Sequence, residues 1–144
     1  LFCDILSEEK RDGRRMLVED SHTVAFVPFF ARFPYEVHVM PKRHVSALPD
    51  LDVNERRSLA RTLQEVVKRY DGLFDAPMPY MMAMHQRPTD GKDYEFYHFH
   101  VEFLPLQRSA GKLKFLAGSE SGAGAFITDM SAEFQAERLK GVKP

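Results

Sequence analysis

The longest regular pattern of apolar and polar positions predicts an amphipathic helix that begins near residue 52. Asp52 and Glu55 have the form of a capping box, in which two side chains satisfy free N–H groups at the start of a helix. Gly72 fits the end of such a helix. Charged residues fill one side of this segment. The other side carries apolar residues at helical spacing: Leu59, Leu63, Val66, Val67, Tyr70 and Phe74. We expect this helix to lie with its apolar side on a sheet.

Shorter segments have the composition or alternation of β-strands, at residues 24–27, 35–40, 80–85 and 95–104. The polar, turn-rich segment 87–93 separates the last two, so we expect them to pair as a hairpin. Ser131 is placed to cap a short helix over 132–140 that ends at Gly141. The pattern predicts a single α+β domain, 1–144, with a mostly antiparallel sheet, one long amphipathic helix and a short C-terminal helix.

The strand predicted at 95–104 carries chemistry on one face. Successive side chains of a strand point to opposite faces, so Tyr97, Phe99, Val101 and Phe103 would face the helix. His98, His100 and Glu102 would share the other face, about 7 Å from one to the next, which is close enough to converge on one ion. His85, at the end of the partner strand, offers a third imidazole. Imidazole with carboxylate suits zinc or iron, whereas the cysteine count excludes soft thiolate sites.

Two other interpretations of these histidines stay open at this point. An imidazole can attack a phosphorus atom as a nucleophile, or transfer a proton near neutral pH, and His100 is the leading candidate for that role. Alternatively, the outer face of the strand is simply polar and half exposed. Spacing alone does not separate a metal ligand from a nucleophile.

Composition narrows the class of protein. A hydrophobic fraction of 44% is typical of a folded globular chain, and a formal net charge of -1 gives no general affinity for nucleic acid or an anionic membrane. No apolar run approaches the roughly 18 residues that span a bilayer, and no signal-peptide pattern opens the sequence. The single cysteine, Cys3, excludes an internal disulfide and fits a reducing compartment. We expect a soluble cytoplasmic protein. It begins at Leu1 rather than Met, as it would if residues upstream had been removed or not included.

A glycine-rich stretch, 117–124, follows Lys112 and Lys114. Glycines let a backbone approach a ligand closely, and the lysines supply positive charge for a phosphate. The same composition also fits an ordinary turn with solvated lysines. The Lys42-Arg43-His44 run also has two interpretations: it is a basic strand end, or it contacts a phosphate.

Several stretches together resemble a known family. PYEVHVMPKRHVSALPDL (34–51), the amphipathic helix and HFHVEFLP (98–105) resemble the histidine-triad superfamily, with Glu102 where a third histidine of the signature would stand. The stretches VAFVPFFARFPYEVHVMPKRHV, RSLARTLQEVVKRYDGLF, MPYMMAMHQRP, QRSAGKLKFLAGSE and MSAEFQAERLK cover nearly the whole chain in order. They resemble the C-terminal half of the galactose-1-phosphate uridylyltransferase family.

The resemblance implies a fold of two similar halves, of which this chain is the second. It also implies a reaction in which a uridylyl group passes from UDP-glucose to a histidine and then to galactose 1-phosphate. The nucleophile would belong to a His-Pro-His motif of the first half, and no such motif occurs here. His85, His98 and His100 would bind a structural iron or zinc, with a glutamate of the first half as the remaining ligand. Because the His-x-His pair of many members lies one residue closer to the Arg-Ser-Ala stretch, Glu102 is a further candidate ligand.

The resemblance also assigns UDP-sugar binding to a loop that serves the neighbouring subunit of a homodimer, with residues Lys114, Phe115, Ser119 and Glu120. The carboxylate would bind sugar hydroxyls, and many members carry tyrosine at the position of Ser119. The partners would be UDP-glucose or UDP-galactose, a hexose 1-phosphate and the N-terminal half. Two alternatives remain: a free-standing histidine-triad nucleotide hydrolase or transferase using His100, and a non-catalytic module for nucleotide-sugar binding or dimerisation.

Overall fold

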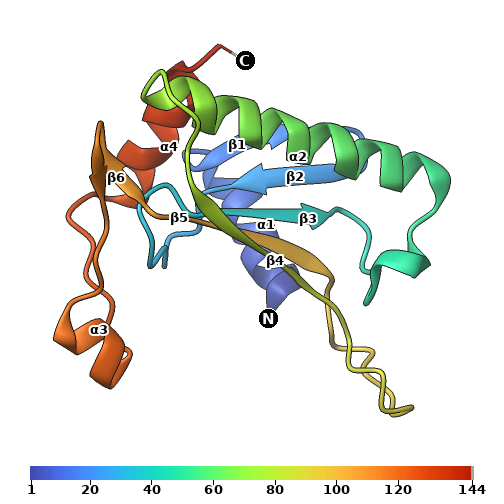
Figure 1. Ribbon diagram of the computed structural model, residues 1–144. Coiled ribbons are helices and arrows are strands. Elements are labelled where there is room, and N and C mark those ends of the chain that lie inside the picture. The colour runs from blue at the N-terminus through green and yellow to red at the C-terminus, as the bar shows by residue number, and fades with distance from the viewer. Residues whose placement is uncertain (144) are drawn as a thin grey trace.

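A computed structural model describes residues 1–143 and contains one five-stranded sheet in which every neighbouring pair is antiparallel (Figure 1). Pro144, the last residue of the expected domain, lies outside the described range. The spatial order is β1-β2-β3-β5-β4. The strands are β1 (Met16–Glu19), β2 (Thr23–Phe26), β3 (Val37–Pro41), β4 (Tyr80–His85) and β5 (His100–Pro105). The α+β prediction and the hairpin between β4 and β5 are therefore confirmed.

The long helix α2 (Val53–Leu73) lies along one face of this sheet, as expected (Figure 1). The Asp52 side chain accepts hydrogen bonds from the N–H groups of Asn54 and Glu55, and the Glu55 carboxylate accepts one from the Asp52 N–H, so the capping box is present. The helix ends at Leu73, one residue beyond the predicted glycine. Gly72 serves a different purpose, because a Cβ there would meet Val142 Cγ1 at 2.5 Å.

The main core lies between α2, the sheet and the C-terminal helix α4 (Ala132–Gly141), which Ser131 caps as predicted. Phe99, just before β5, and Val101 and Phe103 within it point into this core, where they pack with residues of α2 such as Leu59, Val66 and Tyr70. The apolar face expected for this strand is confirmed for these three residues. The strand itself begins at His100, five residues later than predicted, because residues 95 and 96 form a turn and 97–99 have no ladder.

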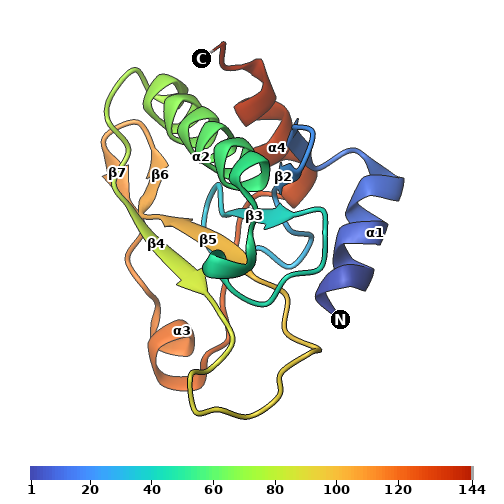
Figure 2. The same ribbon diagram turned by 90° about the vertical axis from the view of Figure 1, so that its right-hand side faces the viewer.

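The opposite face of the sheet is covered in part by α1 (Phe2–Asp12), which the sequence pattern did not predict (Figure 2). Leu6 packs there with alternate residues of β2 and β3, namely Val24, Phe26 and Met40. Most residues of this helix are charged or polar, so its few apolar positions do not form a recognisable helical pattern in the sequence. A buried ion pair between Glu9 and Arg15, 2.8 Å apart, holds the C-terminal part of α1 to the chain that follows it.

The segment after β5 leaves the sheet. It forms a small ribbon of β6 (Gln107–Ser109) and β7 (Lys112–Leu113) and then α3 (Gly118–Ala123), which lies apart from the sheet in Figure 1. The glycine-rich stretch is thus a short helix instead of a turn. A single turn of 3-10 helix, η1 (Leu48–Asp50), precedes α2. No helix within residues 1–143 is long and apolar enough to cross a membrane.

Candidate functional site

His85, His100 and Glu102 converge on the face of the sheet opposite α2. Their ligand atoms all lie within 4.8 Å of one another. The antiparallel register places His85 directly beside His100, and their rings stack with centroids 4.7 Å apart. Glu102 follows on the same face of β5, with its two oxygens 3.7 Å from His100 Nε2 and 3.4 Å from His85 Nε2. Zinc–ligand bonds of about 2.0–2.2 Å place neighbouring ligand atoms of a tetrahedron roughly 3.4 Å apart, so this spacing fits a metal centre.

The two histidines each turn one ring nitrogen toward Glu102, where it could bind a cation. His100 Nδ1 lies 2.9 Å from the backbone carbonyl of His98, and since a carbonyl only accepts, the proton is on Nδ1. His100 Nε2, which faces Glu102, then carries either a second proton or a lone pair available to a metal. His85 Nε2 is buried and lacks a hydrogen-bond partner. A buried polar atom without a partner costs free energy, and a bound metal would remove that cost.

The charge on Glu102 is secured by its surroundings. Hydrogen bonding with His100 lowers the pKa of the Glu102 carboxyl to about 2, although partial burial opposes this shift. Electrostatic interactions with three further side chains lower the pKa of Glu102 as well: His38, His85 and Arg32. Glu102 is therefore a carboxylate at neutral pH and is ready to bind a cation.

Two further polar residues belong to this face and were not assigned to the site from the sequence. His38, opposite Glu102 in the β3–β5 ladder, places Nε2 2.9 Å from Glu36 Oε1 and 3.6 Å from Glu102 Oε1. Glu36 is fully buried, and its other oxygen accepts the N–H groups of Arg32 and Phe33. The alternation of Glu36 and His38 along their strand was visible in the sequence and would have found them.

The side chain of His98 has other partners than those of His85, His100 and Glu102. It precedes β5, and its Nε2 donates to the Pro41 carbonyl at 3.0 Å while its Nδ1 faces Cys3 and His44. Burial lowers the pKa of His98 below its ordinary value, and the hydrogen bond to Pro41 opposes that shift. The structure thus groups Glu102, and not His98, with the other two predicted ligands.

His100 has little room to act as a nucleophile in this arrangement. The residue is 3% exposed, and the centroid of the Phe2 ring lies 4.1 Å from that of its own ring. Attack on phosphorus needs open access along the line of the ring nitrogen. The environment of His100 favours a ligand over a nucleophile.

The four residues of the predicted UDP-sugar loop lie in and around α3, outside the sheet. Lys114 Nζ bonds to Glu120 at 2.6 Å, and both line a pocket of about 130 Å³ together with Phe115 and Arg108. The same carboxylate accepts the N–H groups of Ala117 and Ile127. The bond from Lys114, followed by those two, lowers the pKa of Glu120 to about 2. Phe115 is 85% exposed and Ser119 is also exposed.

An antiparallel sheet with one long helix on a face, and with His100 on β5 beside His85 on β4, defines a histidine-triad-like domain. A HIT-like protein from Bartonella henselae has this fold, with a TM-score of 0.59 and 18% identity over 88% of this chain and 84% of its own. The family to which the chain belongs is a more specific class than this fold. The model of the galactose-1-phosphate uridyl transferase C-terminal domain matches residues 1–143, and the chain belongs to that family.

Individual relatives agree with this assignment. A galactose-1-phosphate uridylyltransferase of Thermotoga maritima is 45% identical over 140 residues, which are 96% of this chain and 43% of the relative. A solved uridylyltransferase structure has 38% identity and a TM-score of 0.89, and the match covers 96% of this chain and 43% of that one. The chain therefore spans about two fifths of the length of the relatives that it matches.

Proposed function

We propose that this chain is the C-terminal part of a hexose-1-phosphate uridylyltransferase that converts UDP-glucose and galactose 1-phosphate into UDP-galactose and glucose 1-phosphate. The observation that carries the proposal is the family match along residues 1–143, combined with the two-fifths coverage of the relatives. The absence of a His-Pro-His motif from the sequence supports a division of labour. The nucleophilic histidine would lie in the N-terminal part, and this chain would contribute metal and UDP-sugar binding.

His85, His100 and Glu102 would hold a divalent zinc or iron ion, with a glutamate of the N-terminal part as the fourth ligand. The unpartnered His85 Nε2 and the ionised Glu102 support this ligand set. A metal there would offset the carboxylate charge and tie β4 to β5. Its role would be structural, and the residues of this chain would do no covalent chemistry.

Lys114, Phe115, Ser119 and Glu120 would bind the UDP-sugar in a neighbouring subunit of a homodimer. The position of α3 away from the sheet supports such a reach (Figure 1). Because Glu120 already bonds to Lys114 and two backbone N–H groups, sugar binding would require it to exchange at least one of these partners. A cytoplasmic location remains a prediction from the single cysteine.

The test is intact-mass spectrometry after incubation with UDP-glucose, quenched without acid because phosphoramidates are acid-labile. This chain would be incubated alone and then mixed with the N-terminal portion of the Thermotoga maritima relative, the part that it does not match. We expect no adduct on this chain in either case. In the mixture, a uridylyl adduct should form on the added portion, and UDP-galactose should be produced when galactose 1-phosphate is supplied.

Other outcomes would identify the alternatives. A uridylyl adduct on this chain alone, lost in a His100→Asn variant, would make it a free-standing histidine-triad enzyme. Binding of UDP-glucose with no turnover in the mixture would make it a non-catalytic module. The N-terminal portion alone serves as the control for activity that does not depend on this chain.

A further inference from the structure

Arg32 connects the α3 segment to the candidate metal site of His85, His100 and Glu102. It lies in the loop between β2 and β3, and its Nη2 lies 3.4 Å from Glu102 Oε2, the oxygen that also faces His85. The same guanidinium lies over the ring of Phe126, with its Cζ 5.6 Å from the ring centroid. Phe126 belongs to the segment between α3 and α4. One side chain thus contacts both the candidate metal site and the segment that follows the predicted UDP-sugar loop.

The position of Phe126 depends on the ion pair of the predicted UDP-sugar loop. Glu120 Oε1 accepts the N–H of Ile127, the next residue, at 3.1 Å, and Lys114 Nζ donates to the Ile127 carbonyl at 3.0 Å. The side chains of this pair are 8% exposed for Lys114 and 2% for Glu120. Phe126 itself packs on the buried ring of Phe33, with the centroids 5.6 Å apart. The two residues that are predicted to meet the sugar therefore hold the backbone beside Phe126.

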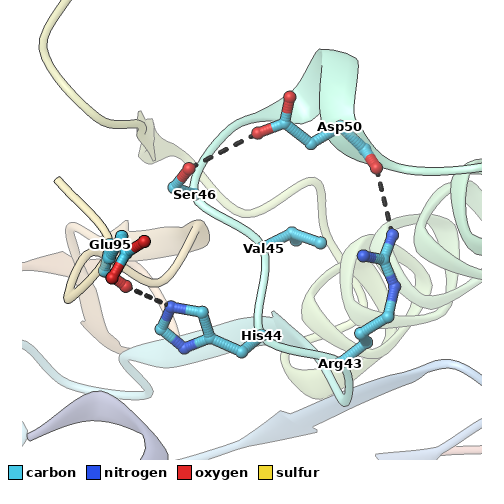
Figure 3. A pocket seen from close by; sticks show the side chains of 6 residues that line it. All are labelled: Arg43, His44, Val45, Ser46, Asp50 and Glu95. Atoms are coloured by element: carbon cyan, nitrogen blue, oxygen red, sulfur yellow. Dashed lines mark hydrogen bonds between the residues drawn. The ribbon is translucent and has the colours of Figure 1, made fainter. Parts of the chain in front are cut away.

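Arg32 is held weakly enough to change partners. Its bond to Glu102 is long, and its side chain is 44% exposed. Arg43 shows the opposite case, because it donates two bonds of 2.7 Å to Glu55 and one of 3.0 Å to the Asp50 carbonyl, the last of which Figure 3 shows. An exposed ion pair or an exposed cation–π contact changes an equilibrium by only about two- to fivefold. Arg32 can therefore leave Glu102 at little cost, whereas Arg43 is fixed.

Arg32 and a divalent metal ion would compete for the same carboxylate. Both are cations, and Glu102 Oε2 faces Arg32 on one side and His85 on the other. A guanidinium at this distance reduces the negative potential that the carboxylate offers to an ion. Repulsion between the two cations then favours one of two arrangements. Either Arg32 lies on Phe126 and pairs with Glu102, or Glu102 binds the metal and Arg32 turns to solvent.

We propose that Arg32 lowers the metal affinity of the candidate metal site and that Phe126 couples this effect to the predicted UDP-sugar loop. The inference rests on the proposed function, which assigns a metal to the first site and a UDP-sugar to the second. When sugar hydroxyls take Glu120 from the Ile127 N–H, the Phe126 ring loses its fixed place and Arg32 loses its support. Glu102 then binds metal more tightly. Because such coupling is reciprocal, metal binding favours UDP-sugar binding by the same factor.

The experiment compares the Co²⁺ affinity of the full chain and its variants, stripped of metal, by competition with a chelating dye. Only the binding that His85→Gln abolishes is counted, so the comparison concerns the candidate metal site. Arg32→Gln should tighten this binding by about two- to fivefold, whereas Arg32→Lys, which keeps the charge, should change it little. Phe126→Leu removes the aromatic face and should tighten it by a similar factor. Arg57→Gln, at an exposed position of α2, is the control for loss of a positive charge elsewhere.

Double variants test the route through Phe126. Glu120→Ala frees the Ile127 N–H without any sugar, so it should tighten Co²⁺ binding by about twofold or more. In the Arg32→Gln background, neither Glu120→Ala nor Phe126→Leu should have a further effect, because both act through the guanidinium. Circular dichroism checks that each variant is folded. Equal Co²⁺ affinity of the unmodified chain and Arg32→Gln, or additive effects in the double variants, would overturn the proposal.

UDP-glucose provides the direct test, in the mixture with the N-terminal portion of the Thermotoga maritima relative. It should tighten Co²⁺ binding by about two- to fivefold, and Arg32→Gln should remove this effect. A mixture that produces UDP-galactose but shows no such change would overturn the coupling alone. If His85→Gln removed no Co²⁺ binding, the metal-site part of the proposed function would fall, and this inference with it. If the mixture produced no UDP-galactose, the enzymatic part would fall while the variants still decided the role of Arg32.

Discussion

Glu55 shows how one carboxylate can join three parts of the chain. It receives two hydrogen bonds of 2.7 Å from the Arg43 guanidinium and one of 2.8 Å from the Asp52 N–H. It therefore ties the start of α2 to the loop that carries His44. The bonds from Arg43 are the largest cause that lowers the pKa of Glu55 to about 2, and burial opposes them.

Glu55→Gln should reduce the free energy of unfolding at neutral pH by about 1.5–3 kcal/mol, the usual contribution of a charge-assisted hydrogen bond. Because the folded-state pKa is lower than the unfolded one, the stabilisation is complete above about pH 4.5 and is lost as the pH falls through about 2. Urea unfolding of both proteins across this range measures the difference. The gap should stay constant down to about pH 5 and then narrow, whereas an exposed control, Glu137→Gln, should show little change. A gap that widens in acid would contradict the assignment.

Local signals predicted the elements whose patterns are strong and isolated. The Asp52–Glu55 capping box and the Ser131 cap each located a helix start, and the turn-rich segment 87–93 located the hairpin of β4 and β5. α1 was missed because its charges outnumber its apolar positions, and only tertiary packing shows that Leu6 is buried.

The sequence predicted correctly which site residues share a face within a strand, because the strand pleat fixes their direction. It did not predict the direction of residues outside the strand. His100 and Glu102 lie within β5, so alternation placed them on one face correctly. His98 precedes the strand, where no pleat fixes its direction, and its ring turns toward Cys3 and His44. Those two residues come from distant segments, and no spacing in the sequence indicates that they meet.

Leu6→Ala tests whether α1 is a packed part of the fold. Leu6 joins Phe26 and Met40 in a small cluster at the edge of the molecule, so the loss should fall at the lower end of the range for buried leucines, about 2–3 kcal/mol. Thermal unfolding measures it, and Ser7→Ala on the exposed side of the same helix is the matched control. Equal stability of the two variants would mean that α1 does not dock as described.

The proposed metal site lies beside the N-terminal helix. Phe2 packs its ring on His100, so α1 covers the site with its first turn. The β4–β5 hairpin provides all three candidate ligands, His85, His100 and Glu102. Metal binding is therefore expected to support the packing of α1, β4 and β5 together.

Removal of metal should lower the stability of the whole chain. Zinc present at about 100 times its dissociation constant stabilises the folded state by about 2.7 kcal/mol per site, which corresponds to roughly 5–10 °C in melting temperature for a chain of this size. A chelator-treated sample should therefore melt lower by about that amount and recover when Zn²⁺ is returned. The variant His85→Gln is the control, because it lacks a ligand of the site and should respond little to either treatment. If the metal-free and metal-loaded chains melted together while circular dichroism showed both folded, this cluster would be a polar surface group and not a structural metal site.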